Sequence, residues 1–244
     1  MTELNAGREF WELRTSAVFA GRDVPHGDGH AVLVLPGLFG NDLYLGTMNQ
    51  WLRRIGYQPL ASRILWNVGC ADRLVDDVDQ HVARQLARLD PERQFSIVGH
   101  SRGGLLAKAL SAKHGRRIRH LILVGSPLGG MLAAGPGGLQ AFEQYMRGDG
   151  ESPRNTVYQM SRRMVQLLDP ECSVPSCDCA YMQGLFDAPD PQTRLTAIFS
   201  TDDAIVPAAI AQVHGITNHA VRGSHSGLMF NAEVYKLIAN ALQT

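Results

Sequence analysis

Ser101 is the residue of this chain whose setting most clearly suggests chemistry. It is the middle residue of GHSRG (residues 99–103), between the apolar stretch FSIVG and the helix-forming stretch GLLAKALSAKHG. This context predicts a sharp strand-to-helix turn that strains the serine backbone and exposes its hydroxyl. Glycine on both sides removes side chains that would collide with the strand and the helix. We therefore expect Ser101 to act as a nucleophile rather than as an ordinary turn residue.

A serine hydroxyl is a poor nucleophile without a base, which must come from elsewhere in the chain. His225 fits this role among the nine histidines, because it lies in the loop VRGSHSGLMFN between the last expected strand and the last expected helix. His214 falls in a helical pattern and His219 at a strand start, where structural roles are expected. The acid that orients the base should follow the strand LTAIFS, and Asp202 and Asp203 both stand there.

A third feature is the stretch PGLFG (residues 36–40), which ends the first expected strand. Acyl transfer needs two donors for the developing oxyanion. The backbone N–H of Arg102, next to the nucleophile, and the N–H of Leu38 are the natural pair. The alternative is that residues 36–40 form a plain turn.

The elements that must position these residues follow an α/β pattern. Near-continuous apolar runs suit strands covered on both faces, and their alternation with helical stretches predicts a mostly parallel sheet with helices on both sides. The expected strands are residues 30–37, 57–64, 94–100, 118–127, 194–203 and 219–223, and the expected helices are residues 45–56, 71–90, 102–115 and 232–242.

Residues 129–191 interrupt this rhythm, since they contain no convincing strand. A segment of this length inside a compact domain predicts an inserted helical cap, with residues 1–128 and 192–244 as the core. Its expected helices are residues 139–148 and 156–169. The candidate substrate contacts are Phe39 in the core and Met131, Leu132, Phe142, Tyr145, Met160, Met164 and Leu168 in the cap. The alternative for each cap residue is that it packs the cap onto the core.

Composition excludes several classes of function. The chain has 244 residues, with 23 basic and 23 acidic side chains, so nothing steers it toward nucleic acid or an anionic membrane. No stretch approaches the roughly 20 apolar residues of a membrane span, and we expect a cytoplasmic location. The cysteines are Cys70, Cys172, Cys177 and Cys179. Their spacing does not match a metal site, and we expect free thiols, with a cross-link or a metal as alternatives.

Five motifs in order resemble the α/β-hydrolase superfamily, in particular the bacterial esterase/lipase group with its PGAP1-like and triacylglycerol-lipase branches. The matching stretches are VLPGLFG, IVGHSRGG, LVGSPLGG, STDDAIVP and GSHSGLMFN, spanning residues 34–231. The resemblance places Asp203 in register with an Asp-x-x-Val-Pro acid loop. Two positions depart from the pattern: Pro36 replaces a common histidine, and Arg102 replaces a common glutamine. We expect Arg102 to place a cation near the entrance of the site.

The resemblance implies an α/β-hydrolase fold and a carboxylic ester hydrolase that uses a Ser101–His225–Asp203 triad, with Leu38 and Arg102 as oxyanion donors and no metal or organic cofactor. The expected substrate is a small ester with an apolar acyl group of short to medium length. We expect no nucleic acid partner, no stable membrane insertion, and a monomer or homodimer. A thioesterase or acyltransferase with the same triad is the alternative enzyme, and a non-catalytic binding protein is the third possibility.

Overall fold

One six-stranded sheet forms the centre of the molecule, in a computed structural model that describes residues 6–90, 92–133, 144, 147, 153–174 and 176–243. The strand order is β2-β1-β3-β4-β5-β6, and every neighbouring pair is parallel. The strands are β1 (Ala31–Leu35), β2 (Gln58–Leu60), β3 (Phe95–His100), β4 (Ile118–Val124), β5 (Arg194–Ser200) and β6 (Thr217–Val221). The predicted fold class is confirmed.

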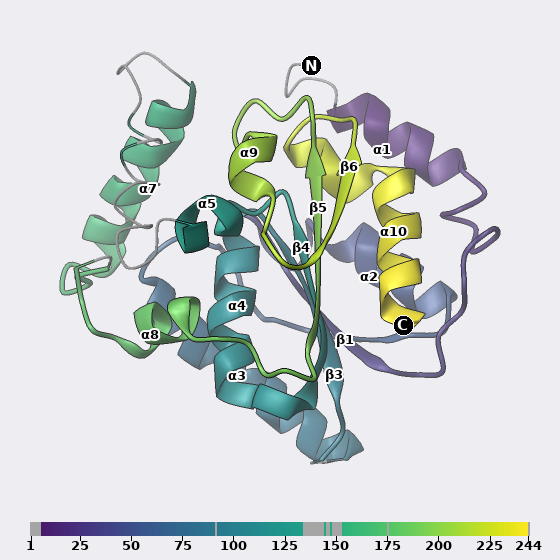
Figure 1. Cartoon of the computed structure of the whole chain (residues 1–244), viewed down its shortest axis with the longest axis horizontal. Coiled ribbons are helices and arrows are strands. Elements are labelled where there is room, and N and C mark those ends of the chain that lie inside the picture. Colours follow the sequence, from purple (N-terminus) through teal and green to yellow (C-terminus); the bar gives the residue numbers. More distant parts are fainter. Residues whose placement is uncertain are drawn as a thin grey trace.

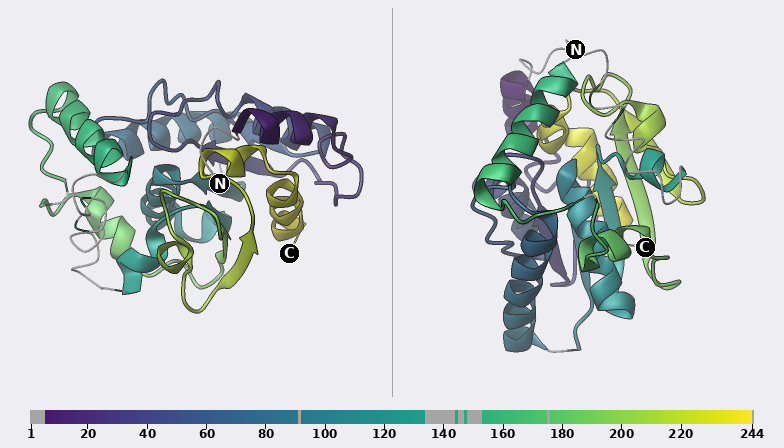
Figure 2. Two further views of the ribbon diagram at one scale, coloured as in Figure 1. Left: turned by 90° about the horizontal axis from the view of Figure 1, so that it is seen from above. Right: turned by 90° about the vertical axis from the view of Figure 1, so that its left-hand side faces the viewer.

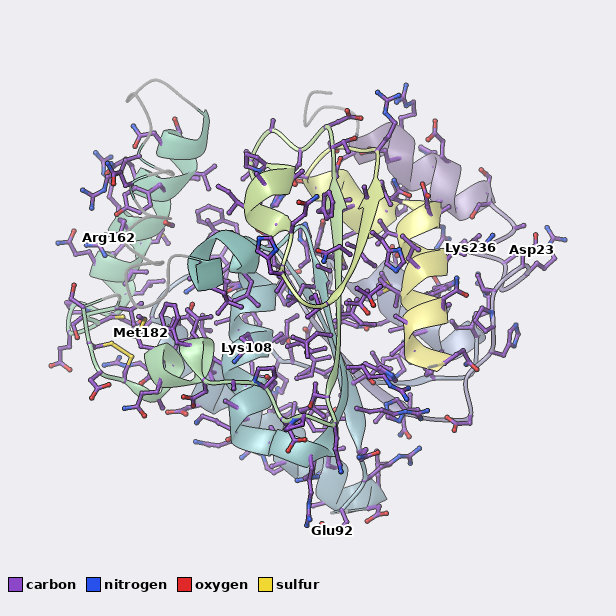
Figure 3. The ribbon with its side chains drawn as sticks, in the orientation of Figure 1. Asp23, Glu92, Lys108, Arg162, Met182 and Lys236 are labelled. Atoms are coloured by element: carbon purple, nitrogen blue, oxygen red, sulfur yellow. A yellow bond between two sulfur atoms is a disulfide. The ribbon has the colours of Figure 1, made fainter. Side chains whose placement is uncertain are left out.

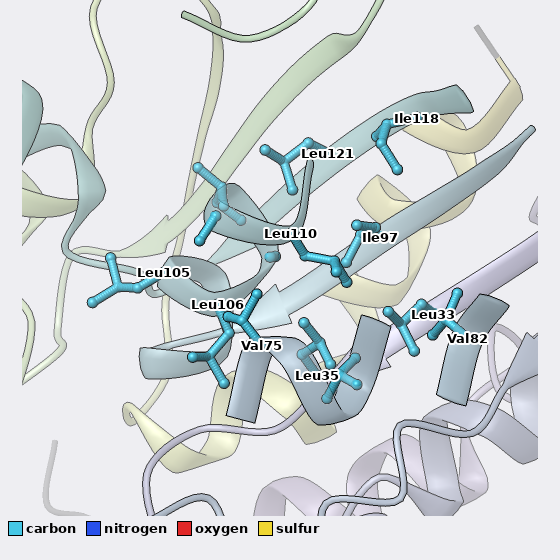
Figure 4. Close-up of a cluster of buried hydrophobic side chains, with 14 of the residues drawn as sticks. Leu33, Leu35, Val75, Val82, Ile97, Leu105, Leu106, Leu110, Ile118 and Leu121 are labelled. Carbon is cyan, nitrogen blue, oxygen red and sulfur yellow. The ribbon is translucent and has the colours of Figure 1, made fainter. Parts of the chain in front are cut away.

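Alternation along the strands explains why both faces of the sheet are covered. In β1, Leu33 and Leu35 belong to one buried cluster, whereas Val32 and Val34 belong to the other. Figure 4 shows part of the first cluster, between the sheet and two helices. The helices on this side are α3 (Ala71–Leu89), α4 (Arg102–His114) and α8 (Ala180–Phe186). Those on the other side are α1 (Ala6–Thr15), α2 (Gly46–Arg54) and α10 (Ala232–Gln243), as Figure 1 shows.

Short elements complete the chain: α5 (Leu128–Ala133), α9 (Ala208–Ala211) and the 3₁₀ turns Gly115–Arg117 and Ser226–Phe230. The sequence pattern does not predict α1. Only Glu9 and Leu13 of its ten residues are buried, so it has no clear apolar stripe.

The two described helices of the segment predicted as a cap lie in different surroundings. Helix α7 (Pro153–Leu168) stands at the outer edge of the molecule, beside the core, in Figure 1 and in the left view of Figure 2. Helix α8 instead packs on α4, where the ammonium of Lys108, labelled in Figure 3, donates to the carbonyls of Gly184 and Asp187 at 2.7 Å each. The expected helix at residues 139–148, with Phe142 and Tyr145, lies outside the described residues.

The cysteines correct one expectation. Cys177 and Cys179 form a disulfide, with Cα atoms 5.3 Å apart, so the expectation of free thiols is wrong for this pair. A single intervening residue lets their Cα atoms approach within the range that a disulfide spans. Cys70 and Cys172 are free thiols. Among the described residues, no helix is both long and apolar enough to cross a membrane.

Candidate active site

The turn after β3 holds Ser101 in a conformation that few residues other than glycine adopt. Its φ is 53°, and its N–H donates to the carbonyl of Val124 at 2.8 Å. The flanking glycines are required by space. A Cβ on Gly99 would lie 2.5 Å from the Cα of Gly104, and a Cβ on Gly103 would lie 2.4 Å from the carbonyl oxygen of Leu35. The helix can therefore begin directly against two strands.

His225 bridges Ser101 and Asp203. The Ser101 hydroxyl donates to His225 Nε2 at 2.9 Å, and His225 Nδ1 donates to Asp203 Oδ2 at 2.6 Å. The other carboxylate oxygen of Asp203 accepts the N–H groups of Ile205 and Val206 at 2.8 Å each. The Asp203 side chain is fully buried, so the loop after β5 fixes its orientation.

Asp202 takes a different place, although it is the next residue along the chain. Its carboxylate lies 3.2 Å from Nε of Arg222, whose side chain is 80% exposed. A single residue step in the loop thus turns one carboxylate toward the imidazole and the other toward the surface.

Contacts from distant elements hold the loop that carries His225. Glu9 of α1 is buried, and its carboxylate accepts the N–H of Ser224 at 2.9 Å and the hydroxyl of Ser224 at 2.7 Å. Tyr44 donates its hydroxyl to the carbonyl of Ser226 at 2.9 Å. The backbone on both sides of the histidine is therefore anchored.

His100 lies beneath His225 and supports it from the strand side. Its Nε2 donates to the His225 carbonyl at 3.1 Å, and the two rings lie 5.0 Å apart. Burial, and then the charge of His225, lowers the pKa of His100 to about 3, so this ring is neutral near pH 7. Its Nδ1 is enclosed against Gly37 and has no hydrogen-bond partner among the described residues.

The loop at residues 36–40 runs past the serine. Phe39 has a φ of 61°, and its N–H donates to the carbonyl of Asn67 at 3.1 Å. Asn67 is fully buried and donates its amide to the carbonyl of Pro36 at 2.6 Å. The N–H of Leu38 makes no hydrogen bond within the described part of the chain, so it is free to donate to a ligand.

The Arg102 side chain does not lie at the entrance, which corrects the sequence-based expectation. Its Nη1 donates to Asn67 Oδ1 at 2.6 Å, and its Nη2 donates to the Gly69 carbonyl at 2.7 Å. These two acceptors draw the guanidinium into the cavity wall. Burial lowers the pKa of this guanidinium.

Ser101 opens into a cavity of about 520 Å³. The 36–40 loop, the start of α4, the acid loop and the histidine loop form one part of its wall. Helix α7 forms another part, through Val157, Tyr158, Ser161, Arg162 and Val165.

The cavity corrects most of the predicted substrate contacts. Phe39 lines it, but Met131, Leu132, Met160 and Met164 are not among its described lining residues. Met131, on α5, belongs to the buried core cluster, and Leu132, on the same helix, packs against that cluster. The α7 lining residues recur every three or four positions on one face; Met160 falls outside that face, and Met164 lies at its edge. Leu168 is exposed and belongs to a second, neighbouring depression.

A second serine–histidine contact lies at the opposite end of the sheet. Ser96 Oγ lies 2.9 Å from His30 Nε2 and 3.2 Å from His120 Nδ1. All three side chains are buried, and neither cavity described above includes them. Burial, followed by the charge of Arg119, lowers the pKa of each histidine to about 4. Within the described part of the chain this cluster has neither an opening for a substrate nor a carboxylate that accepts from either ring, so we assign it a structural role in the sheet.

Sequence reasoning missed the residues that position the site, namely Glu9, Tyr44, Asn67 and His100. His100 had a signal, because it lies inside the GHSRG motif. Asn67 follows a tryptophan in a loop of no regular pattern, and Glu9 lies in a helix without an apolar stripe. Their roles depend on contacts between distant elements, which no local pattern encodes.

Comparison with known proteins identifies the family. The model of the alpha/beta hydrolase fold family matches residues 31–176, which is more than half of the chain. The chain therefore belongs to the α/β hydrolase fold family. A search of curated protein sequences finds no significant match.

Solved structures share the fold at low identity. Polyneuridine aldehyde esterase is 11% identical with a TM-score of 0.56, and the match covers 89% of this chain and 100% of that one. A lipase-esterase related protein from Clostridium acetobutylicum is 13% identical with a TM-score of 0.53, over 89% and 97% of the two chains. A thioesterase from the prodiginine biosynthetic pathway of Streptomyces coelicolor is 17% identical with a TM-score of 0.50, over 87% and 90%. At these identities the likeness concerns the fold.

Proposed function

We propose that this protein hydrolyses carboxylic esters through an acyl-enzyme on Ser101. The observation that carries the proposal is the continuous hydrogen-bonded line from Ser101 through His225 to Asp203, with contacts of 2.9 and 2.6 Å, at the wall of a cavity. A base within hydrogen-bond reach of the nucleophile, itself oriented by a third group, is the arrangement that nucleophilic catalysis requires.

Each group has a defined part in the proposed reaction. Nε2 of His225 takes the proton as Ser101 Oγ attacks the ester carbonyl, and it later gives that proton to the leaving alkoxide. Asp203 holds the imidazole in the tautomer with a proton on Nδ1 and stabilises its cation. The N–H groups of Leu38 and Arg102 stabilise the oxyanion. Water then attacks the acyl-enzyme, with His225 again as the base.

The described part of the predicted cap takes a narrower role in this proposal. Residues 153–174 supply α7 and the loop that follows it, which contributes Cys172 and Val174 to the cavity wall. We assign the substrate cover to these residues, because α8 packs on the core helix α4 and contributes only Tyr181 to the described cavity wall.

Two measurements test this function. A fluorophosphonate probe should label wild-type protein at Ser101, as located by peptide mass spectrometry, and the Ser101→Ala variant should not be labelled. A panel of p-nitrophenyl esters from acetate to palmitate should show turnover of short to medium chains. Faster cleavage of an acyl-CoA, or transfer to an added alcohol, would instead assign a thioesterase or acyltransferase. Absence of both labelling and turnover would contradict the proposal and favour a binding protein.

A further inference from the structure

The charged side chains of the cavity are unbalanced in sign. Two arginines, Arg102 and Arg162, are among its described lining residues, and no aspartate or glutamate is. The rest of the wall is mainly apolar. A cavity of this composition favours a ligand with an apolar body and a negative group.

Arg102 is the deeper of the two cations, and its hydrogen bonds leave its charge unbalanced. Both acceptors, Asn67 Oδ1 and the Gly69 carbonyl, are neutral. Arg102 forms no ion pair with a carboxylate in the described part of the chain. Its Nε makes no hydrogen bond there and is not fully enclosed, so this N–H can donate to a ligand in the cavity.

The groups around the guanidinium do not supply the missing charge. Tyr181 and Cys172 also line the cavity, and either could compensate Arg102 only as an anion. Burial raises the pKa of Tyr181 to about 12 and that of Cys172 to about 11, so both are neutral near pH 7. A buried charge in proteins is usually paired, because desolvation of an unpaired charge is costly.

We propose that the cavity takes an ester that carries a carboxylate, and that the Arg102 guanidinium binds this carboxylate. The proposal rests on the proposed function, whose substrate class it narrows. A guanidinium presents its N–H donors in a plane that matches a carboxylate, and these charge-assisted bonds are stronger than neutral ones. Asn67 and Gly69 hold the side chain in place before the ligand binds, which lowers the entropic cost of binding.

Arg162 would add attraction at the rim of the cavity. It is exposed on α7, labelled in Figure 3, and its Nη1 donates to the Val174 carbonyl at 3.3 Å. Exposed charges are screened by salt, so we expect its effect to be smaller than that of Arg102.

Matched substrate pairs test the charge preference. Mono(4-nitrophenyl) adipate carries a carboxylate on the acyl half, and 4-nitrophenyl methyl adipate is its neutral counterpart. The pair 4-carboxyphenyl butyrate and 4-(methoxycarbonyl)phenyl butyrate places the difference on the alcohol half. After subtraction of uncatalysed hydrolysis, kcat/KM should favour the anion at least tenfold in one pair, which also identifies the half that meets Arg102. Equal values or a preference for the neutral ester in both pairs would overturn the proposal.

The Arg102→Gln variant separates recognition of the anion from support of the loop. If Arg102 binds the carboxylate, the ratio of kcat/KM for anionic over neutral ester should fall about 10- to 100-fold, which is about 1.4 to 2.8 kcal/mol. If it only braces Asn67 and Gly69, both esters should lose rate equally and the ratio should not change. Arg162→Gln should lower the ratio less, and Arg163→Gln, an exposed neighbour outside the cavity wall, should leave it unchanged.

A binding experiment tests recognition of the carboxylate without any need for turnover. Calorimetric titration of the Ser101→Ala variant should show tighter binding of monomethyl adipate than of dimethyl adipate. A second substitution, Arg102→Gln, should remove this difference in affinity. Equal affinity for the two probes would overturn anion recognition even in an active hydrolase. Conversely, absence of labelling and turnover in the wild type would overturn the hydrolase function, while a preference for monomethyl adipate would keep the anion site.

Discussion

Strand β3 carries a serine near each end, and each serine contacts histidine, but the two surroundings differ. Ser96 lies inside the paired strand at the amino end of the sheet, and it shares its hydroxyl between His30 and His120. Ser101 lies just past the carboxyl end, in a turn with a φ of 53°, and it meets the single ring of His225. The distances from Oγ to the nearest ring nitrogen are equal, at 2.9 Å.

Proximity of serine and histidine therefore does not define the site. Three further features separate the two ends: a buried carboxylate that fixes the histidine tautomer, a strained turn that lifts the serine out of the strand, and a cavity. The carboxyl end has all three, and crevices at the carboxyl ends of strands are where ligands bind in open α/β sheets. The amino end has none of them in the described residues, and its histidines are held neutral by burial.

The largest expected effect comes from removal of one serine hydroxyl or the other. Ser101→Ala should lower kcat for a p-nitrophenyl ester by about 10⁴- to 10⁶-fold, because the covalent step is lost. Ser96→Ala should lower the midpoint of urea unfolding but leave kcat within a few-fold, since Ser96 reaches no substrate. Retention of a tenth of wild-type kcat by Ser101→Ala, with contamination excluded, would contradict the assignment.

Adjacent aspartates give the next largest difference. Asp203→Asn should lower kcat by about 10⁴-fold, because the imidazole loses its partner and its correct tautomer. Asp202→Asn removes only a contact with an exposed arginine, and we expect less than about a tenfold change, or 1.4 kcal/mol. Steady-state kinetics of both variants decide the matter. The reverse order of effects would move the acid to Asp202.

The two ends of β3 also show which features of the fold and of the site can be predicted from sequence. The strands, the main helices and the candidates Ser101 and His225 follow from local patterns, since strand periodicity and glycine at a crowded turn act over a few residues. Local pattern left Asp202 and Asp203 both open, and only the resemblance to a family acid loop favoured Asp203. Local patterns did not predict which α7 residues line the cavity, because the rotational phase of the helix decides that Ser161 and not Met160 faces it. The inward course of Arg102 also depends on Asn67, a residue 35 positions away. Such contacts are fixed only when the chain is folded.

Substitution of Glu9 should destabilise the loop that carries His225 without changing a residue of the triad. Its carboxylate accepts two hydrogen bonds from Ser224, next to His225. In Glu9→Gln an amide NH₂ would replace one acceptor and face a donor. We expect the free energy of unfolding to fall by about 1.5 to 3 kcal/mol, with a smaller loss of kcat than for Asp203→Asn. Urea denaturation provides the measurement. Glu12→Gln, an exposed position on the same helix, is the control and should change stability by less than about 0.5 kcal/mol.

The histidines at the amino end of the sheet should affect the stability of the protein in acid rather than its catalysis. His30 and His120 have pKa values of about 4 in the folded protein, against 6.5 when unperturbed. Between these values the unfolded chain binds more protons than the folded one, so the free energy of unfolding falls as pH decreases from 6.5 toward 4. Each histidine contributes a slope of up to about 1.4 kcal/mol per pH unit in this window.

Substitution of one histidine sharpens the test. His120→Gln should reduce this slope by up to about 1.4 kcal/mol per pH unit, whatever it does to stability at pH 7, because one histidine fewer takes up a proton on unfolding. His214→Gln, at an exposed position, is the control for the loss of a histidine outside this cluster. Urea denaturation at several pH values between 4 and 7 gives the slopes. If His120→Gln and wild type had the same slope, His120 would bind protons equally in both states, and burial at this end of β3 would not keep it neutral.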